Sequence, residues 1–251
     1  MAPVADSALP AAPTLRGAVR TALADLYYHS WRLVPANVVW AVVAILVGFA
    51  IVFIPVGFLA LPVLALPTAG LFRMATRIAR GQAVSFGDSL DAWRSDVGTT
   101  LLLGGGLSIV AVVLTINVTT GLLSGAVLGW AFATLAFWGL IAAWLYAWTA
   151  WPLATDPARG RWPAADRLRL AGLLVLAHPL RIGALALVLA AFLAISTIAI
   201  VALLTVSVAV SAVVAARFVL PAADRLDARL GYAVVRGLDV VGSAGDDLLD
   251  D

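Results

Sequence analysis

Three long stretches of this chain contain no charged side chain, and arginines lie just beyond both ends of each. The stretches are residues 33–72, 97–155 and 182–216. A bilayer core about 30 Å thick needs roughly 20 apolar residues of helix for each crossing. Each stretch is therefore long enough to enter a membrane more than once, and the sequence predicts an integral membrane protein made of helices.

The composition excludes an ordinary soluble domain. Hydrophobic residues make up 63% of the chain and charged residues 12%, whereas a typical soluble domain carries about 25% charged residues. A soluble fold of 251 residues could not keep that much apolar surface away from water. The chain has no cysteine, which excludes disulfides, thiolate metal sites and thiol catalysis.

The positions of the arginines predict the topology. All 16 basic residues are arginines, and all lie outside the three stretches. Positive residues in short loops stay on the cytoplasmic side, so each stretch should cross an even number of times. This predicts an all-α polytopic transmembrane bundle of three hairpins and six helices, in a bacterial inner membrane, with both termini cytoplasmic.

The third hairpin has an alternative. Residues 182–216 give two crossings of about 17 residues each, the lower limit for a span, and residues 199–208 contain no Gly, Pro or Asn to mark a turn. Five crossings with one long final helix are therefore the alternative to six.

The turns of the other two hairpins follow from their Pro, Gly and Asn residues. In the first, a helix from residue 37 to about 54 should turn at Pro55 and Gly57, and prolines should interrupt its return helix at Pro62 and Pro67. In the second, Asn, Thr and Gly at residues 117–121 predict the turn.

Amphipathic segments lie between the stretches. Residues 85–96 and 163–177 combine apolar residues at helical spacing with aspartates and arginines, which predicts helices along the cytoplasmic face of the membrane. The chain then divides into a cytoplasmic N-terminal segment (1–26), a transmembrane domain (27–221), and a cytoplasmic amphipathic segment with an acidic, disordered tail (222–251).

Small residues recur every fourth position near the middle of the chain. They are Gly121, Gly125, Gly129 and Ala133. Such a stripe lets another helix approach closely. The expected partner is a helix of the same chain, and a second subunit is the alternative.

Aromatic and basic residues next to the stretches should anchor the helices at the membrane interface. The expected anchors are Trp31, Arg32, Trp93, Arg94, Trp144, Trp148, Trp151, His178 and Arg181. The arginines should also contact anionic lipid headgroups, so nucleic acid is not an expected partner.

Little reactive chemistry is available within the stretches. Coupled transporters usually hold an ionisable group at membrane depth, and these stretches contain no Asp, Glu, Arg or Lys. The two histidines of the chain, His29 and His178, stand at predicted helix entries, where interfacial placement is the simplest interpretation. We therefore expect no catalytic, cofactor or metal site.

The order of several short motifs resembles the YesL-like family of small bacterial membrane proteins. The motifs are Asn37 with Trp40, the run Leu66, Pro67, Thr68, Ala69 and Gly70, then Phe86, Asp88, Ala92 and Trp93, and last His178 and Pro179 with Arg181. In the family the central run has a longer spacing between its proline and glycine. The resemblance implies a polytopic inner-membrane protein without an established function that accompanies carbohydrate uptake systems.

Three functions are then to be compared. The first is a non-catalytic accessory or assembly component of a solute uptake system, with transporter subunits or a second copy of the chain as its partner. The second is an uncoupled facilitator or channel, whose hydroxyls and amides should converge on one cavity. The third, an enzyme using His29 and His178, requires the two histidines to approach each other or an aspartate within hydrogen-bond reach.

Overall fold

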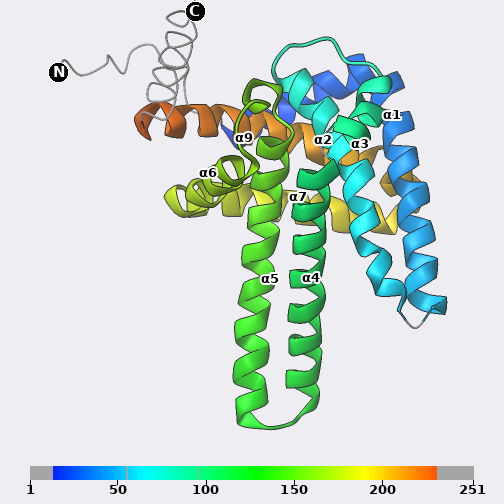
Figure 1. The fold of residues 1–251 in the computed structure, drawn as a ribbon, viewed down its shortest axis with the longest axis vertical. Coiled ribbons are helices and arrows are strands. Elements are labelled where there is room, and N and C mark those ends of the chain that lie inside the picture. The colour runs from blue at the N-terminus through cyan, green and yellow to red at the C-terminus, as the bar shows by residue number, and fades with distance from the viewer. Residues whose placement is uncertain (1–13, 55, 96, 231–251) are drawn as a thin grey trace, which may run out of the picture.

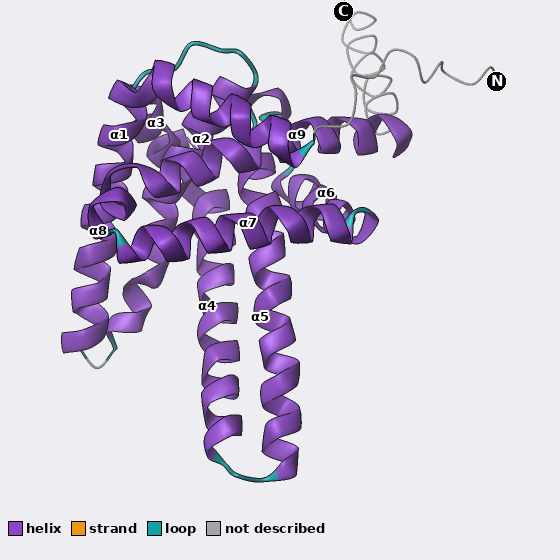
Figure 2. Cartoon of the chain, turned by 180° about the vertical axis from the view of Figure 1, so that it is seen from behind, coloured by secondary structure: helices purple, strands orange, loops and turns teal. Residues whose placement is uncertain are grey.

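The computed structural model describes residues 14–54, 56–95 and 97–230, and within these ranges every regular element is a helix (Figures 1 and 2). The longer elements are α1 (Leu15–Phe53), α2 (Ala65–Ala79), α3 (Gly87–Ser95), α4 (Val97–Leu123), α5 (Val127–Ala154), α6 (Ala164–Ala177), α7 (Pro179–Ile198) and α9 (Val208–Leu230). Short elements connect them: the 3-10 helices η2 (Gly57–Leu64) and η3 (Pro157–Arg159), one turn of helix α8 (Ile200–Ala202), and the π-helical turn η4 (Leu203–Ser207).

Six helical segments are long and apolar enough to cross a membrane. They are Leu15–Phe53, Gly57–Ala79, Val97–Leu123, Val127–Ala154, Pro179–Ile198 and Leu204–Leu230. The predicted all-α class and the count of six are confirmed, and the chain is a multi-pass membrane protein. The alternative of five is wrong because Ala199 leaves the helical conformation (φ −93°, ψ 73°), so α7 ends at Ile198 without a Gly, Pro or Asn.

The centre of the molecule is α9. It contacts α1, α2, α5, α6 and α7, and 78% of the most apolar window in its span is buried, against 11% in each of α4 and α5. Alanines and valines of α9, among them Ala212, Val213 and Ala215, are fully enclosed. Their small side chains allow the surrounding helices to approach α9 closely.

The α4–α5 hairpin projects from the rest of the molecule, and α7 and α9 run across its direction (Figures 1 and 2). This arrangement differs from the three upright hairpins that the sequence predicts.

The turn of the α4–α5 hairpin lies later than we expected. Helix α4 continues through residues 117–121 and ends at Leu123, and the chain turns at Gly125, which has a positive φ of 65°. The predicted turn is wrong because the polar side chains of that segment bond to carbonyls one turn earlier. Thr119 Oγ1, for example, donates to the carbonyls of Thr115 and Ile116 at 3.0 Å. In lipid these bonds allow a polar run to continue a helix.

The first hairpin shows the expected proline effect at Pro62, but Pro67 does not interrupt the return helix. Helix α1 ends at Phe53, and the return begins as the 3-10 helix η2, which contains Pro62. Pro67 then lies in the first turn of α2, where its missing N–H leaves no hydrogen bond unmade. Trp40 of α1 donates from Nε1 to Thr68 Oγ1 of α2 at 3.0 Å, so the two arms of the hairpin are joined beside Pro67.

A side-chain amide of α1 bridges the π-helical turn before α9. Asn37 is fully buried. Its Nδ2 donates to the Leu204 carbonyl at 2.9 Å, and its Oδ1 accepts from the Ala209 backbone N–H at 2.8 Å. A π-turn leaves backbone groups without their usual α-helical partners. Asn37 supplies partners to two of them, and thereby ties α1 to the beginning of α9.

The predicted amphipathic helices are present as α3 and α6, with nearly the expected bounds. The predicted domain boundaries fall inside helices, because α1 runs unbroken through residues 26 and 27 and α9 through 221 and 222. The acidic tail that we expected at the end of the chain lies outside the described residues.

Candidate functional site

A cluster of arginines and aspartates joins three segments that are distant in sequence. Arg80 caps α2, Asp156 and Arg159 follow α5, and Asp224 lies on α9. Arg80 contacts Asp156 (Nη2 to Oδ2, 2.6 Å) and Asp224 (Nη1 to Oδ2, 2.7 Å), while Arg159 contacts the same two carboxylates at 2.5 and 2.6 Å. Each carboxylate is thus shared by two guanidinium groups. We call these four residues the ion-pair cluster.

Two of the four side chains in the ion-pair cluster are buried, while those of Arg80 and Asp224 are 23% and 40% exposed. The side chain of Asp156 is 0% exposed and that of Arg159 4%. Hydrogen bonds from Arg80 to Asp224 raise the pKa of Arg80 above its ordinary value; burial acts in the opposite direction, and the contact with Asp156 adds to the rise. Breaking a buried pair leaves an uncompensated charge, so the cluster should fix the position of α9 against the ends of α2 and α5.

Two further pairs tie the same side of the molecule together. Arg217 of α9 donates to Asp25 of α1 from Nε and Nη2, at 2.7 and 2.9 Å. Arg77 of α2 pairs with Asp88 of α3, which also accepts from the Ser85 backbone N–H at 2.6 Å. Burial acts to raise the pKa of Asp88, but the bond from Ser85 and the charge of Arg77 outweigh it, so the pKa lies below its ordinary value.

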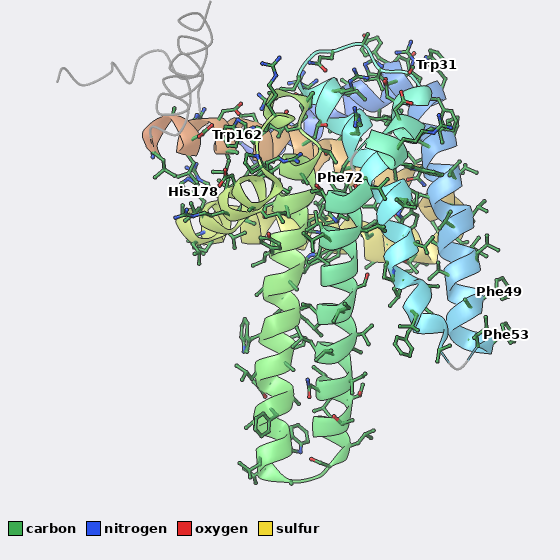
Figure 3. All side chains as sticks on the ribbon, viewed as in Figure 1. Trp31, Phe49, Phe53, Phe72, Trp162 and His178 are labelled. Carbon is green, nitrogen blue, oxygen red and sulfur yellow. The ribbon has the colours of Figure 1, made fainter. Side chains whose placement is uncertain are left out.

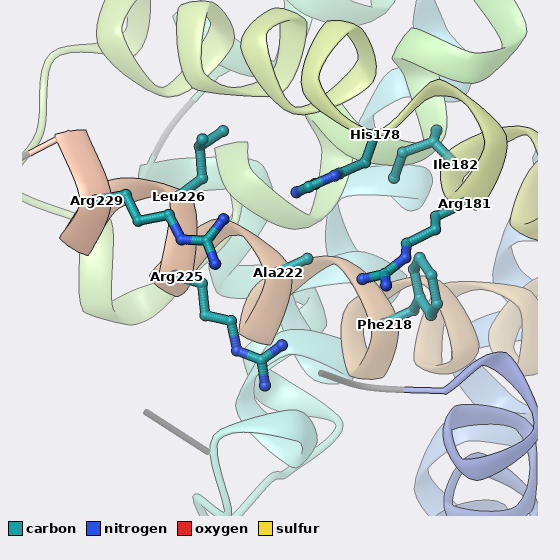
Figure 4. A pocket seen from close by; sticks show the side chains of 8 residues that line it. All are labelled: His178, Arg181, Ile182, Phe218, Ala222, Arg225, Leu226 and Arg229. Atoms are coloured by element: carbon teal, nitrogen blue, oxygen red, sulfur yellow. The ribbon is translucent and has the colours of Figure 1, made fainter. Parts of the chain in front are cut away.

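A second charged feature is a pocket of about 350 Å³ between the beginning of α7 and the end of α9. Its walls carry one histidine and three arginines, and no carboxylate is among the eight residues that line it. These residues are His178, Arg181, Ile182, Phe218, Ala222, Arg225, Leu226 and Arg229. We call it the basic pocket. Figure 4 shows the side chains of His178, Arg181 and Arg229 directed toward the space between the two helices.

The local sequence explains the basic pocket. Phe218, Ala222, Arg225 and Arg229 follow one another at steps of three or four residues, so they share one face of α9. His178 stands at the junction where α6 ends and α7 begins, and Arg181 follows in the first turn of α7. The packing of this junction beside α9 therefore brings the basic side chains of both segments to one place.

The polar side chains at membrane depth mostly bond to their own helices. Ser108 Oγ donates to the Gly104 carbonyl at 2.7 Å, and Thr134 Oγ1 donates to the Trp130 carbonyl at 2.9 Å. The same pattern, with an acceptor three to five positions earlier, holds for Asn117, Thr119, Thr120, Ser124, Thr149, Thr197 and Ser207. None of these side chains lines the basic pocket or the groove of about 570 Å³ between α4 and α5.

No protein family, characterised protein or solved structure matches this chain. The resemblance to the YesL-like family stays a prediction. Its motif residues nevertheless have clear structural positions: Asn37 holds the π-helical turn, Trp40 joins α1 to α2, and Asp88 holds α3.

The two histidines lie on different elements. His29 is half-buried in α1, and His178 lines the basic pocket. In residues 14–54, 56–95 and 97–230, neither imidazole forms an ion pair or a hydrogen bond with an aspartate, and no group of three or more metal-binding side chains occurs. The structure therefore does not bring together the groups that the enzyme hypothesis requires.

Five of the expected interface anchors lie at the surface or near it. Trp31 is 68% exposed, and the Arg32 guanidinium lies 4.2 Å from the centre of its ring. Trp93 is half-buried in α3, and Arg94 is exposed. Trp144 is partly exposed and donates from Nε1 to the Ala186 carbonyl of α7 at 3.2 Å. The expected anchors His178 and Arg181 line the basic pocket.

Trp148 and Trp151 are not interfacial anchors. They are 7% and 8% exposed, and their rings lie 5.9 and 6.0 Å from the ring of Phe72 on α2. The expectation fails because α5 is apolar on all sides, so its sequence does not show which face meets the protein and which meets lipid.

The small residues pack inside the α4–α5 hairpin. Gly121 belongs to α4 and Gly129 and Ala133 to α5, while Gly125 forms the turn. They therefore do not form a stripe on one helix. A Cβ atom at Gly121 would lie 2.5 Å from the Gly129 carbonyl oxygen and 2.9 Å from Ala133 Cβ. The close approach is between two helices of the same chain.

Proposed function

We propose that the chain is a non-catalytic accessory or assembly component of a solute uptake system in a bacterial inner membrane, with cytoplasmic termini. The observation that carries the proposal is the bonding of the membrane-depth hydroxyls. An uncoupled facilitator needs polar groups converging on a path through the membrane. Here most of those groups donate to carbonyls of their own helices, which favours an accessory over a facilitator.

The exposed α4–α5 hairpin supports the same proposal. Only 11% of the most apolar window of each helix is buried. Large side chains on α5, including Phe132, Leu135 and Trp138, are between 62% and 70% exposed. In the membrane such a surface is available to lipid and to the helices of another membrane protein. A transporter subunit that docks there would place this chain beside the transport path without lining it.

Site-specific crosslinking tests the proposal. A photo-reactive amino acid replaces Trp138 in the protein, which is expressed at its native level in the membrane. This probe should crosslink to one transporter subunit in stoichiometric amount. The matched control is the same probe at Tyr27, which is 79% exposed on α1 and lies away from the hairpin. Crosslinks of equal yield from both positions would argue against docking through the hairpin.

Reconstitution tests the facilitator. The purified chain in proteoliposomes should show no flux of sugars or other small solutes above protein-free vesicles. Sustained flux that a bulky substitution in the groove between α4 and α5 blocks would overturn the accessory proposal and establish the facilitator instead.

A further inference from the structure

The basic pocket differs from the other charged sites of the described chain. Arg77, Arg80, Arg159 and Arg217 each contact an aspartate within the protein. In the basic pocket, by contrast, the guanidinium groups of Arg181 and Arg229 and the imidazole of His178 face a shared volume whose eight lining residues include no acid. Positive groups gathered in this way attract an anion, and their mutual repulsion is relieved when one binds.

The chemistry of the lining residues selects the type of anion. A guanidinium presents a planar fork of N–H donors that matches the oxygens of a phosphate group, and several such groups around one volume can engage more than one oxygen. The volume of about 350 Å³ is within the usual range for small-molecule sites. A phosphate ester therefore fits both the charge and the size of the basic pocket.

The surroundings of the pocket indicate where the phosphate comes from. Leu180, directly beside Arg181, is 88% exposed, and Leu176 at the end of α6 is 79% exposed. Leu187 and Ile195 continue this apolar surface along α7, at 71% and 67% exposed. Because α7 is long and apolar enough to cross a membrane, its beginning at His178 and Arg181 lies where headgroups and acyl chains meet. Figure 3 shows His178 beside the junction of α6 and α7.

We propose that the basic pocket binds the phosphate group of an anionic membrane lipid, whose acyl chains lie along the exposed apolar face of α7. Basic pockets next to membrane helices are suited to anionic headgroups. Arg181 and Arg229 provide the forked donors from opposite sides, while His178 and Arg225 complete the positive wall. The bound lipid then ties α7 to α9 at the membrane surface.

Native mass spectrometry of the full chain in detergent tests this site with added lipid. Phosphatidylglycerol should bind in a one-to-one complex, and phosphatidylcholine, whose headgroup has no net charge, should bind at least tenfold more weakly. The variant Arg181→Gln/Arg229→Gln should weaken phosphatidylglycerol binding roughly 30-fold, because each arginine near a membrane surface contributes about fivefold in affinity.

The matched control is Arg161→Gln/Arg169→Gln, which removes the same charge from two exposed arginines outside the pocket and should leave the affinity within about twofold. Arg229→Lys keeps the charge without the fork and should fall between the wild-type chain and the double variant. It also reports on the site if the double variant fails to fold.

Two results would overturn the proposal. Equal weakening by the pocket and control variants would mean that the lipid senses only net charge. Inorganic phosphate that displaces phosphatidylglycerol at equal concentration would mean that the pocket serves a soluble phosphate compound rather than a lipid. Retention of phosphatidylglycerol against a large excess of inorganic phosphate supports the lipid site.

Discussion

Replacing Asn37 with alanine should destabilise the protein by about 2 kcal/mol. The change leaves the Leu204 carbonyl and the Ala209 N–H without the amide that bonds to both at 2.9 and 2.8 Å. A buried polar group without a partner costs about 1–3 kcal/mol, while measured side-chain hydrogen bonds within membranes average only about 0.6 kcal/mol. The expected loss of unfolding free energy therefore lies between the contribution of one weak hydrogen bond and the cost of leaving two buried polar groups without partners.

Asn117→Ala is the matched control. Its amide also donates to a backbone carbonyl, that of Val113 at 3.0 Å, but this carbonyl lies within a regular stretch of α4 and Asn117 is exposed. The carbonyl therefore keeps its helical partner after the change. We expect the free energy of unfolding to stay within about 0.5 kcal/mol of the wild-type value.

Titration with SDS in mixed micelles, monitored by the fluorescence of the nine tryptophans, measures the free energy of unfolding of both variants. Asn37→Leu separates the effect of the lost hydrogen bonds from that of the cavity, because leucine fills a similar space without an amide. This variant should show most of the loss in unfolding free energy that Asn37→Ala shows. The reasoning is refuted if Asn37→Ala and Asn117→Ala shift the unfolding free energy equally, since the π-helical turn would then not depend on the amide.

Three further changes can be measured by the same titration. Asp156→Asn should cost about 3 kcal/mol, because it removes one of the two carboxylates that balance Arg80 and the buried Arg159. The exposed Asp91→Asn should cost under about 0.5 kcal/mol, and equal losses would contradict a special role for the ion-pair cluster. The lowered pKa of Asp88 gives stability that is complete above the ordinary aspartate pKa of about 3.9 and is lost as the pH falls through the lower folded value. Asp88→Asn should therefore flatten the fall in stability below about pH 4, and an unchanged fall would rule this out. Gly121→Ala places a Cβ 2.5 Å from a backbone oxygen of α5 and should cost about 1–3 kcal/mol. Gly106→Ala, with nothing within 4 Å of the added Cβ, should be neutral or slightly stabilising. A neutral Gly121→Ala would show that the hairpin can open at no cost.

The helices could be predicted from the sequence because the membrane requires little more than length and apolar composition. The turns were predictable only where backbone chemistry forces them. Pro62 removes a backbone donor, and the structure is a 3-10 helix there, whereas Pro67 stands in the first turn of α2 without breaking it. Asn117 and Thr119 suggest a turn in water, but within lipid they bond to their own helix, so the turn moves to Gly125.

The charged sites could not be predicted because their members are far apart in the chain. Arg80 and Asp156 are separated by 76 positions, and a rule that counts arginines beside membrane spans treats each charge alone. The basic pocket is a similar case: Arg225 and Arg229 visibly share a helix face, but only the fold brings His178 and Arg181 opposite them. Pairing is a property of the tertiary structure, and the sequence supplies only the charges.

The central position of α9 has a consequence for biosynthesis. Every other described helix precedes α9 in the chain, so α1, α2 and α5 enter the membrane before the helix on which they pack has been translated. Until then Asp25 lacks Arg217, and the amide of Asn37 lacks Ala209. The nascent protein therefore passes through an intermediate in which these helices are not yet packed on α9. During that interval an insertase would protect it or a membrane protease would degrade it.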